Sequence, residues 1–214
     1  GSPCGCDLQL NYLGVLEGEE RATRSDPSLF YWFYWGVPAT PAAAYTVVYR
    51  SQLHSEELNI RTRQWQRLAP LAGFRAVQLE EDLDVVDATN TSTGVFSNVR
   101  NHMYGVQFGG QALLCQWGYS RLETVVKAGV LMNDVSLSAQ ASSVTGSPYN
   151  LSRDFYHTAF CGEFQLTWVY VFGPYMQGKL GYQALFLDGV ALAPDQNDNF
   201  SVTTGEGFLD LGSS

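Results

Sequence analysis

The sequence predicts an all-β protein: an antiparallel up-and-down β-barrel of about 8–10 strands with a polar lumen and an apolar exterior. Three observations support this prediction. Apolar and polar residues alternate with the period of two that strands produce. Glycine and proline turn signals such as Gly118 and Gly173-Pro174 separate the alternating segments. A helical period of 3.6 residues is missing over any useful length.

The alternating segments come in an order that favours one domain over residues 1–214. Residues 1–8 form an N-terminal arm with cysteines, and residues 27–44 are rich in aromatic residues, proline and alanine. Around Asn133 the apolar residues change from even to odd positions, which predicts a β-bulge. The expected strands include Asp7–Leu16, Tyr45–Arg50, Glu57–Arg63, His102–Gln116, Arg121–Met132, Phe164–Phe172 and Met176–Phe186.

One uncharged stretch, Pro27–Tyr49, resembles a membrane helix by charge alone. Pro38, Pro41 and Gly36 interrupt it, so a spanning helix is excluded. The run of aromatic residues inside this stretch is compatible with an interfacial girdle, a subunit contact or core packing. We favour a subunit contact through Phe30, Tyr31, Trp32, Phe33, Tyr34 and Trp35.

The polar faces of the expected strands decide the architecture. They hold glutamine, asparagine and glycine with single charges among them, which suits a hydrogen-bonded lumen inside an apolar exterior. Small barrels are filled by their side chains, so these residues are expected to plug the lumen as an ion-pair network. The predicted lumen residues are Glu57, Asn59, Arg61, Arg75, Gln107, Gln111, Glu123, Lys127, Glu163, Gln165, Lys179 and Gln183.

Charge and cysteine content restrict the partners. The net charge is −9, and only 15% of the residues are charged whereas 14% are aromatic. This acidic balance argues against nucleic acid as the main partner. The apolar exterior favours copies of the same chain or outer-membrane lipid as partners. An even number of cysteines is compatible with up to two disulfides, an inter-chain bridge or buried free thiols. The disulfide candidates are Cys4, Cys6, Cys115 and Cys161.

No motif predicts catalysis. Gly173–Lys179 resembles a phosphate-binding loop, but Leu180 replaces the serine or threonine that binds magnesium, and no helix follows. We therefore expect no enzyme activity and no cofactor. A weak calcium candidate consists of the oxygen-bearing residues Asp195, Asn197 and Asp198.

Several motifs resemble one family of proteins. They occur in the same order from about Ser51 to Gln196, and Gly181–Gln196 (GYQALFLDGVALAPDQ) gives the clearest match. The chain is similar in these motifs to the beta-barrel porin family 7 of planctomycete bacteria. The resemblance implies a cell-envelope β-barrel without assigned catalytic residues. The other motifs are Leu53–Arg61, Leu71–Arg75, Leu79–Leu83, Asn101–Gly109 and Val126–Val130.

Three functions follow as expectations. The first is a non-enzymatic surface barrel that self-assembles into an extracellular fibre or tube, because an apolar exterior has to be covered. The ending Gly207–Ser214 lacks the terminal aromatic residue of outer-membrane barrels, which favours this hypothesis. The alternative is a monomeric outer-membrane, porin-like barrel with a small or plugged pore. An envelope-associated hydrolase or carbohydrate binder is the third. No signal peptide is visible, which fits a mature or a cytosolic chain.

Overall fold

The computed structural model describes residues 5–25, 44–62, 67–88, 94–142, 149–194, 200–201 and 206–207. These residues form one seven-stranded sheet and a separate two-stranded sheet. The strands of the large sheet are β1 (Cys6–Arg24), β2 (Tyr45–Thr62), β3 (Leu68–Asp87), β4 (Gly94–Trp117), β5 (Ser120–Ser142), β6 (Tyr149–Gly173) and β7 (Met176–Asp188). The small sheet pairs β8 (Phe200–Ser201) with β9 (Glu206–Gly207).

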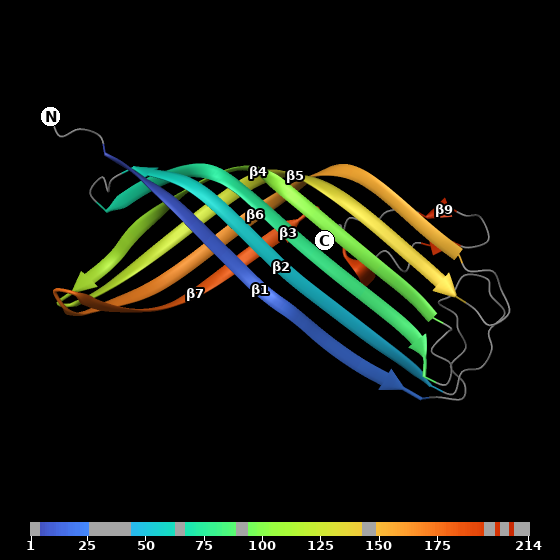
Figure 1. Ribbon diagram of the computed structural model, residues 1–214. Helices are drawn as coiled ribbons and strands as arrows, with labels where there is room; N and C mark the ends of the chain where they lie inside the picture. The colour runs from blue at the N-terminus through green and yellow to red at the C-terminus, as the bar shows by residue number, and fades with distance from the viewer. Residues whose placement is uncertain are drawn as a thin grey trace.

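The large sheet has up-and-down topology. Each strand pairs antiparallel with its neighbour in sequence, in the order β1 to β7. The sheet curls into a half-barrel (Figure 1), so the predicted all-β, antiparallel architecture is confirmed. The described part of the large sheet has seven strands where the alternation indicates about 8–10. No helix among the described residues is long and apolar enough to cross a membrane.

The two ends of the sheet differ in their connections. At one end, short connections of residues 63–67, 118–119 and 174–175 join successive strands. Gly118 has a φ of 55°, a left-handed conformation that glycine adopts without strain, and it closes the tight turn between β4 and β5. At the opposite end the connections are residues 25–44, 88–93 and 143–148. We call the first end the short-turn end and the second the long-loop end.

The bulge predicted at Asn133 is wrong. Strand β5 keeps a regular register through Asn133 with both of its neighbours. The apolar residues change parity there because Val135 and Leu137 are buried on the concave side, whereas Val130 and Met132 are exposed on the outer side. Register shifts lie instead between Val15 and Gly18, Leu113 and Cys115, and Val171 and Gly173.

The parity change marks an exchange of polarity between the two faces of the sheet. Near the short-turn end, the outer face is apolar and the concave face carries buried charges. Toward the long-loop end, the concave face becomes apolar. There it holds two hydrophobic clusters, one around Met103 and Leu131 and the other around Val99 and Val135.

The chain after β7 enters the concave side. Gly189 has a φ of 70°, and a Cβ at this position would lie 2.7 Å from the carbonyl oxygen of Thr158. Glycine is therefore required at this turn. Residues 189–194, which we call the luminal segment, pack their alanines against the second hydrophobic cluster, and both Ala191 and Ala193 are fully buried.

The three cysteines that the structure describes, Cys6, Cys115 and Cys161, are free, so the predicted disulfides do not form among them within one chain. Cys115 lies opposite Leu122 of β5, whereas Cys161 lies opposite Gly129 of the same strand. This offset separates the two thiols by roughly 20 Å along the sheet, far beyond disulfide reach. Cys4 lies outside the described residues, as do the predicted contact residues Phe30–Trp35 and the calcium candidates Asp195, Asn197 and Asp198.

Candidate functional site

Four charged side chains from four strands meet on the concave side near the short-turn end. Lys127 Nζ donates hydrogen bonds to Glu57 Oε2 at 2.7 Å and to Glu163 Oε1 at 3.0 Å. Arg75 Nη1 donates to Glu163 Oε2 at 2.7 Å, and Arg75 Nη2 lies 3.3 Å from Glu57 Oε1. All four residues are buried. We call them the lumen quartet; its two positive and two negative formal charges balance, so each buried charge has partners of opposite sign.

Neutral polar groups add further hydrogen bonds to the quartet. Gln107 Nε2 donates to Glu57 Oε2 at 3.0 Å and to Asn59 Oδ1 at 2.7 Å. Gln165 Nε2 donates to the carboxylate of Glu163. Ser55 Oγ accepts a hydrogen bond from Nε of Arg75. The buried residues of this network fill the lumen at this level, as expected for a barrel of few strands.

A cavity of about 500 Å³ lies between the quartet and the short-turn end. Arg61 donates hydrogen bonds to Gln111 at 2.6 Å and to Asp7 at 3.2 Å. Gln111 in turn donates to Glu123, whose carboxylate is 2.6 Å from Arg121. The cavity is thus a polar vestibule on the short-turn side of the quartet. Its lining residues are Asp7, Arg61, Ala69, Gln111, Leu113, Gln116, Arg121, Glu123 and Lys179.

The luminal segment is held by side chains of the opposite wall. Asn101 Nδ2 donates to the carbonyl of Ala191 at 2.8 Å, and Asn101 Oδ1 accepts from the amide of the same residue at 2.9 Å. Asn133 Nδ2 donates to the carbonyl of Gly189 at 3.2 Å. The side chains of these two asparagines therefore form hydrogen bonds with the backbone of the luminal segment, as the backbone of a neighbouring strand would.

A third side chain completes this clamp. Glu81 Oε2 accepts a hydrogen bond from the amide of Ala193 at 2.9 Å. Glu81, Asn101 and Asn133 are not among the residues that the sequence patterns indicate as functional. One signal was available: all three have odd numbers, like the neighbouring lumen residues, and they lie within otherwise apolar inward rows. Their partner lies 56 to 112 residues away in sequence, so local patterns do not reveal it.

The predicted lumen residues fall into three groups. Glu57, Asn59, Arg75, Gln107, Lys127, Glu163 and Gln165 come together in the quartet and its shell. Arg61, Gln111, Glu123 and Lys179 line the vestibule. Gln183 is exposed on the edge strand β7.

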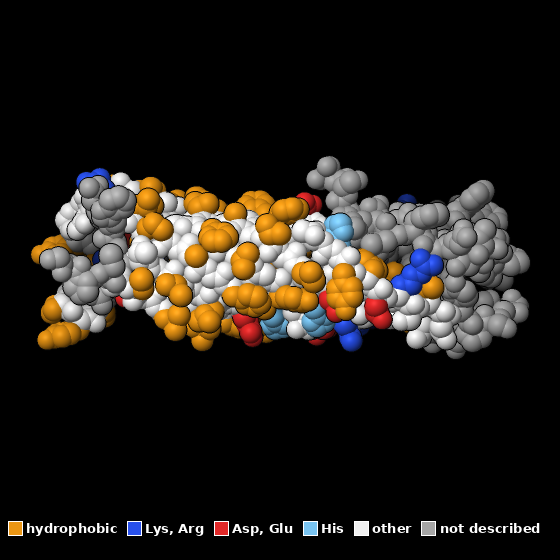
Figure 2. All heavy atoms as spheres, turned by 90° about the horizontal axis from the view of Figure 1, so that it is seen from above, with side chains coloured by type: hydrophobic (Ala, Val, Ile, Leu, Met, Phe, Trp, Pro, Cys, Tyr) orange, Lys and Arg blue, Asp and Glu red, His pale blue; other side chains and the backbone are white. Residues whose placement is uncertain are grey.

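The outer face carries an aligned apolar band at the level of the quartet. Pairing register places Leu58, Phe74, Val106, Val130 and Phe160 directly opposite one another in successive strands. Figure 2 shows hydrophobic side chains spread along this outer face. The outer band comprises the exposed side chains Leu58, Ile60, Phe74, Val106, Phe108, Val126, Val130, Phe160, Phe164, Leu180 and Phe186.

Aromatic residues border the outer band on both sides. Tyr12 and Tyr104 lie in one row toward the long-loop end. Trp168 and Tyr170 lie at the opposite border, with ring centroids 6.3 Å apart. From Met132, opposite Tyr104, to the row of Tyr170, β5 covers roughly 12 residues, or about 40 Å along the strand. At the strand tilt of about 40° that is typical of barrels, this corresponds to a height of about 30 Å along the barrel axis.

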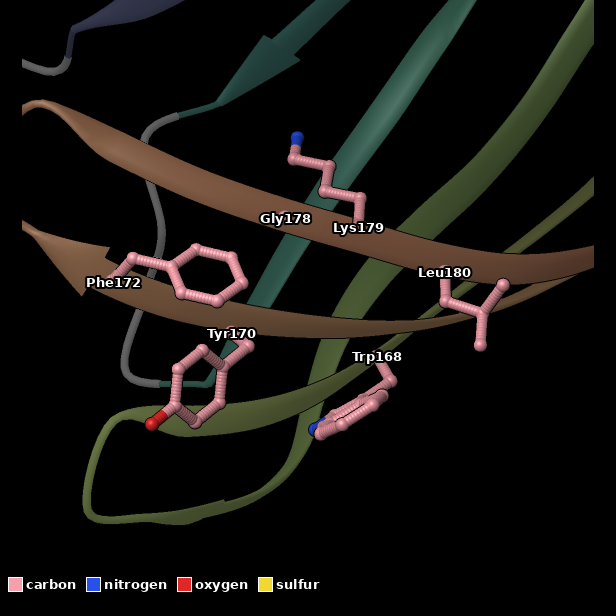
Figure 3. A pocket seen from close by; sticks show the side chains of 6 residues that line it. All are labelled: Trp168, Tyr170, Phe172, Gly178, Lys179 and Leu180. Carbon is pink, nitrogen blue, oxygen red and sulfur yellow. The ribbon is translucent and has the colours of Figure 1, made fainter.

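A surface cavity of about 470 Å³ lies beside this aromatic border (Figure 3). Trp168, Tyr170 and Leu180 point to one side of the sheet, whereas Lys179 points to the other. The lining groups therefore do not converge on one ligand. We interpret the aromatic side chains as part of the border of the outer band.

Beyond the band, the outer face is polar. Gln52, Glu80, Arg100, Ser136 and Asp154 lie opposite one another across five strands. In Figure 2, the acidic, basic and histidine side chains gather toward this end.

Hydrogen bonds order this polar part of the outer face. Burial raises the pKa of Glu80, but hydrogen bonds from Gln78 and Gln52 and the charge of Arg100 outweigh it, so this pKa lies below its usual value. Among the residues that the structure describes, no group of three His, Cys, Asp or Glu side chains is arranged to hold a metal ion.

Comparisons with known proteins give no assignment. No protein-family model matches the sequence, and no curated protein matches it.

Proposed function

We propose that this chain is a membrane-embedded β-barrel of the outer-membrane type with a sealed lumen, which anchors its polar part outside the bilayer and does not conduct solutes. The outer band is the observation that carries this proposal. Its aromatic borders and its height of about 30 Å match the lipid-facing surface of such barrels. The resemblance to the porin family is retained as part of the same proposal.

The connections and the concave face add support. Outer-membrane barrels have short turns on the periplasmic side and longer loops outside, so the short-turn end would face the periplasm. The lumen quartet fills the concave side inside the band, and the luminal segment fills it farther toward the long-loop end. Polar residues within a membrane are tolerated when they face the interior and are paired with one another, as these are.

Reconstitution into phospholipid vesicles tests the proposal. We expect the protein to remain with the vesicles after washing with sodium carbonate, and to release none of an entrapped small fluorophore. An open porin of the same vesicle batch serves as the positive control for release. Recovery of the protein in the wash would contradict membrane insertion, and fluorophore release at the porin level would contradict the sealed lumen.

A second candidate function is supported by a different observation. Among the described residues, β1 and β7 each pair on one side only, and open sheet edges promote association between chains. This feature supports the extracellular fibre that the sequence suggests. Electron microscopy of detergent-free protein separates the two functions: regular fibres support self-assembly, whereas vesicle-bound particles support the membrane barrel.

A further inference from the structure

The vestibule is a cavity that the proposed membrane function does not use. Its volume of about 500 Å³ lies within the range of small-molecule sites in proteins, roughly 300–1,000 Å³. Its lining comes from β1, β2, β3, β4, β5 and β7, because the curl of the sheet brings Asp7 and Lys179 of the two edge strands to the same space. A molecule in the vestibule would therefore be surrounded by side chains from most of the sheet.

Hydrogen bonds and ion pairs hold the polar walls of the vestibule in place. Arg61 connects Asp7 to Gln111, and Gln111 donates to Glu123 at 3.1 Å. Glu123 Oε1 lies 2.6 Å from Arg121 Nε, so this chain of contacts extends from β1 to β5. Side chains that are already ordered lose little conformational entropy when a ligand binds. The two positive and two negative charges of the chain of contacts also balance one another.

Lys179 adds a fifth charge to the vestibule. Its pairing partner in β6 is Val169, which is fully buried and lies opposite Arg121 of β5. Residues that lie directly opposite each other in paired strands share one face of the sheet, so Lys179 faces the concave side together with these two residues. In Figure 3, Lys179 accordingly points away from the side of the sheet that carries Trp168 and Tyr170.

The ammonium group of Lys179 has no partner of opposite charge. Among the residues that the structure describes, none forms a hydrogen bond or an ion pair with it. Lys127, the other lysine of the chain, contacts two carboxylates of the quartet. The vestibule therefore has three positive and two negative charges, an excess of one positive charge, although the net charge of the whole chain is −9. Such a local excess attracts anions.

The lining of the vestibule also indicates the class of ligand. Ala69 and Leu113 add apolar surface to its wall, and the ammonium group of a lysine donates strong hydrogen bonds to a carboxylate. One excess positive charge is balanced by one negative charge. We propose that the vestibule binds a small organic monocarboxylate, with the carboxylate at Lys179 and the apolar part against Ala69 and Leu113. Binding at this place requires neither insertion into a membrane nor conduction through the lumen, so the proposal goes beyond the function proposed above.

Titration of ¹⁵N-labelled protein in detergent micelles, followed by NMR spectroscopy, tests this proposal. The probe is benzoate, and benzamide serves as its neutral counterpart of nearly the same size and shape. Both are added at low ionic strength, because salt screens exposed charges. The backbone amide signal of residue 179 should shift saturably with benzoate. Its midpoint concentration should be at least about fivefold lower than with benzamide, as expected for one exposed ion pair.

Two variants locate the charge that binds the carboxylate. Lys179→Gln removes the ammonium group at an exposed position, where the fold should tolerate the change. It should raise the midpoint for benzoate by about fivefold. Arg100→Gln removes a positive charge from the polar outer face, away from the vestibule, and should leave the midpoint unchanged.

Two results in the unchanged protein would overturn the proposal: no saturable shift with benzoate, or equal midpoints for benzoate and benzamide. Equal effects of Lys179→Gln and Arg100→Gln would overturn it as well. Phthalate carries a second carboxylate, for which the vestibule offers no further excess positive charge. A lower midpoint for phthalate than for benzoate would therefore contradict a site for a monocarboxylate.

Discussion

Arg75 has a fully buried guanidinium group that depends on two carboxylates for compensation. Alternation alone assigned Arg75 and its partners to the concave face, because side chains of a strand alternate between faces. The sequence could not tell which of the twelve predicted lumen residues would meet. That depends on the stagger between strands, which places Glu57 opposite Arg75 and Lys127 opposite Glu163.

Replacing the arginine of the quartet should destabilise the protein strongly. Arg75→Leu leaves Glu57 and Glu163 with only one positive partner in a buried site, and such uncompensated charge costs about 3–5 kcal/mol. Urea unfolding in detergent micelles measures the loss in free energy of unfolding. Arg61→Leu, at a half-buried position in the vestibule, should cost about 1 kcal/mol or less. Equal effects of the two changes would contradict the central role of the quartet.

Asn101 holds the luminal segment through two hydrogen bonds with the backbone of Ala191. Asn101→Leu removes both partners of the Ala191 backbone, and each buried group left unsatisfied costs about 1–3 kcal/mol. Amide hydrogen exchange at Ala191 should therefore speed up by at least tenfold, whereas Asn150→Leu, at an exposed position of β6, should leave it unchanged. Unchanged exchange in Asn101→Leu would mean that the hydrogen bonds to Asn101 do not hold the segment.

At the scale of elements, β5 shows how far pattern reading extends. The even-numbered apolar residues up to Met132 and the odd-numbered ones from Val135 are both visible in the sequence. The pattern supports two interpretations: a bulge that keeps one apolar face, or a regular strand whose two faces exchange polarity. Only the pairing of β5 with β4 and β6 distinguishes them, and it shows the regular strand. The strands are longer than predicted because they continue into the part that is polar outside.

The luminal segment is an element that no local pattern predicts. Its sequence continues the apolar run of β7, so a simple extension of the strand would be expected. Gly189 ends β7 instead, and the segment fills a space that other strands create. Such long-range contacts depend on the assembled barrel.

At the scale of the whole molecule, composition and architecture agree. The low charge content and the many aromatic residues were attributed to an apolar exterior, and the exposed outer band fits this interpretation. A period-two pattern is the same for every strand. It therefore predicts neither the number of strands nor whether the edge strands are paired. Either lipid or another copy of the chain could cover the band. Our proposal assigns lipid, because the height of the band and its aromatic borders match a lipid-facing surface.

Depth-resolved fluorescence quenching in vesicles tests this central claim most directly. An environment-sensitive fluorophore is attached through Val126→Cys in the middle of the outer band, or through Ser138→Cys on the polar outer face, with the native cysteines replaced. Both positions are exposed, and circular dichroism checks that the fold is retained. Lipids brominated near the middle of their acyl chains should strongly quench the label at position 126 and leave the label at position 138 unaffected. Weak, equal quenching at both positions would contradict a lipid-facing band.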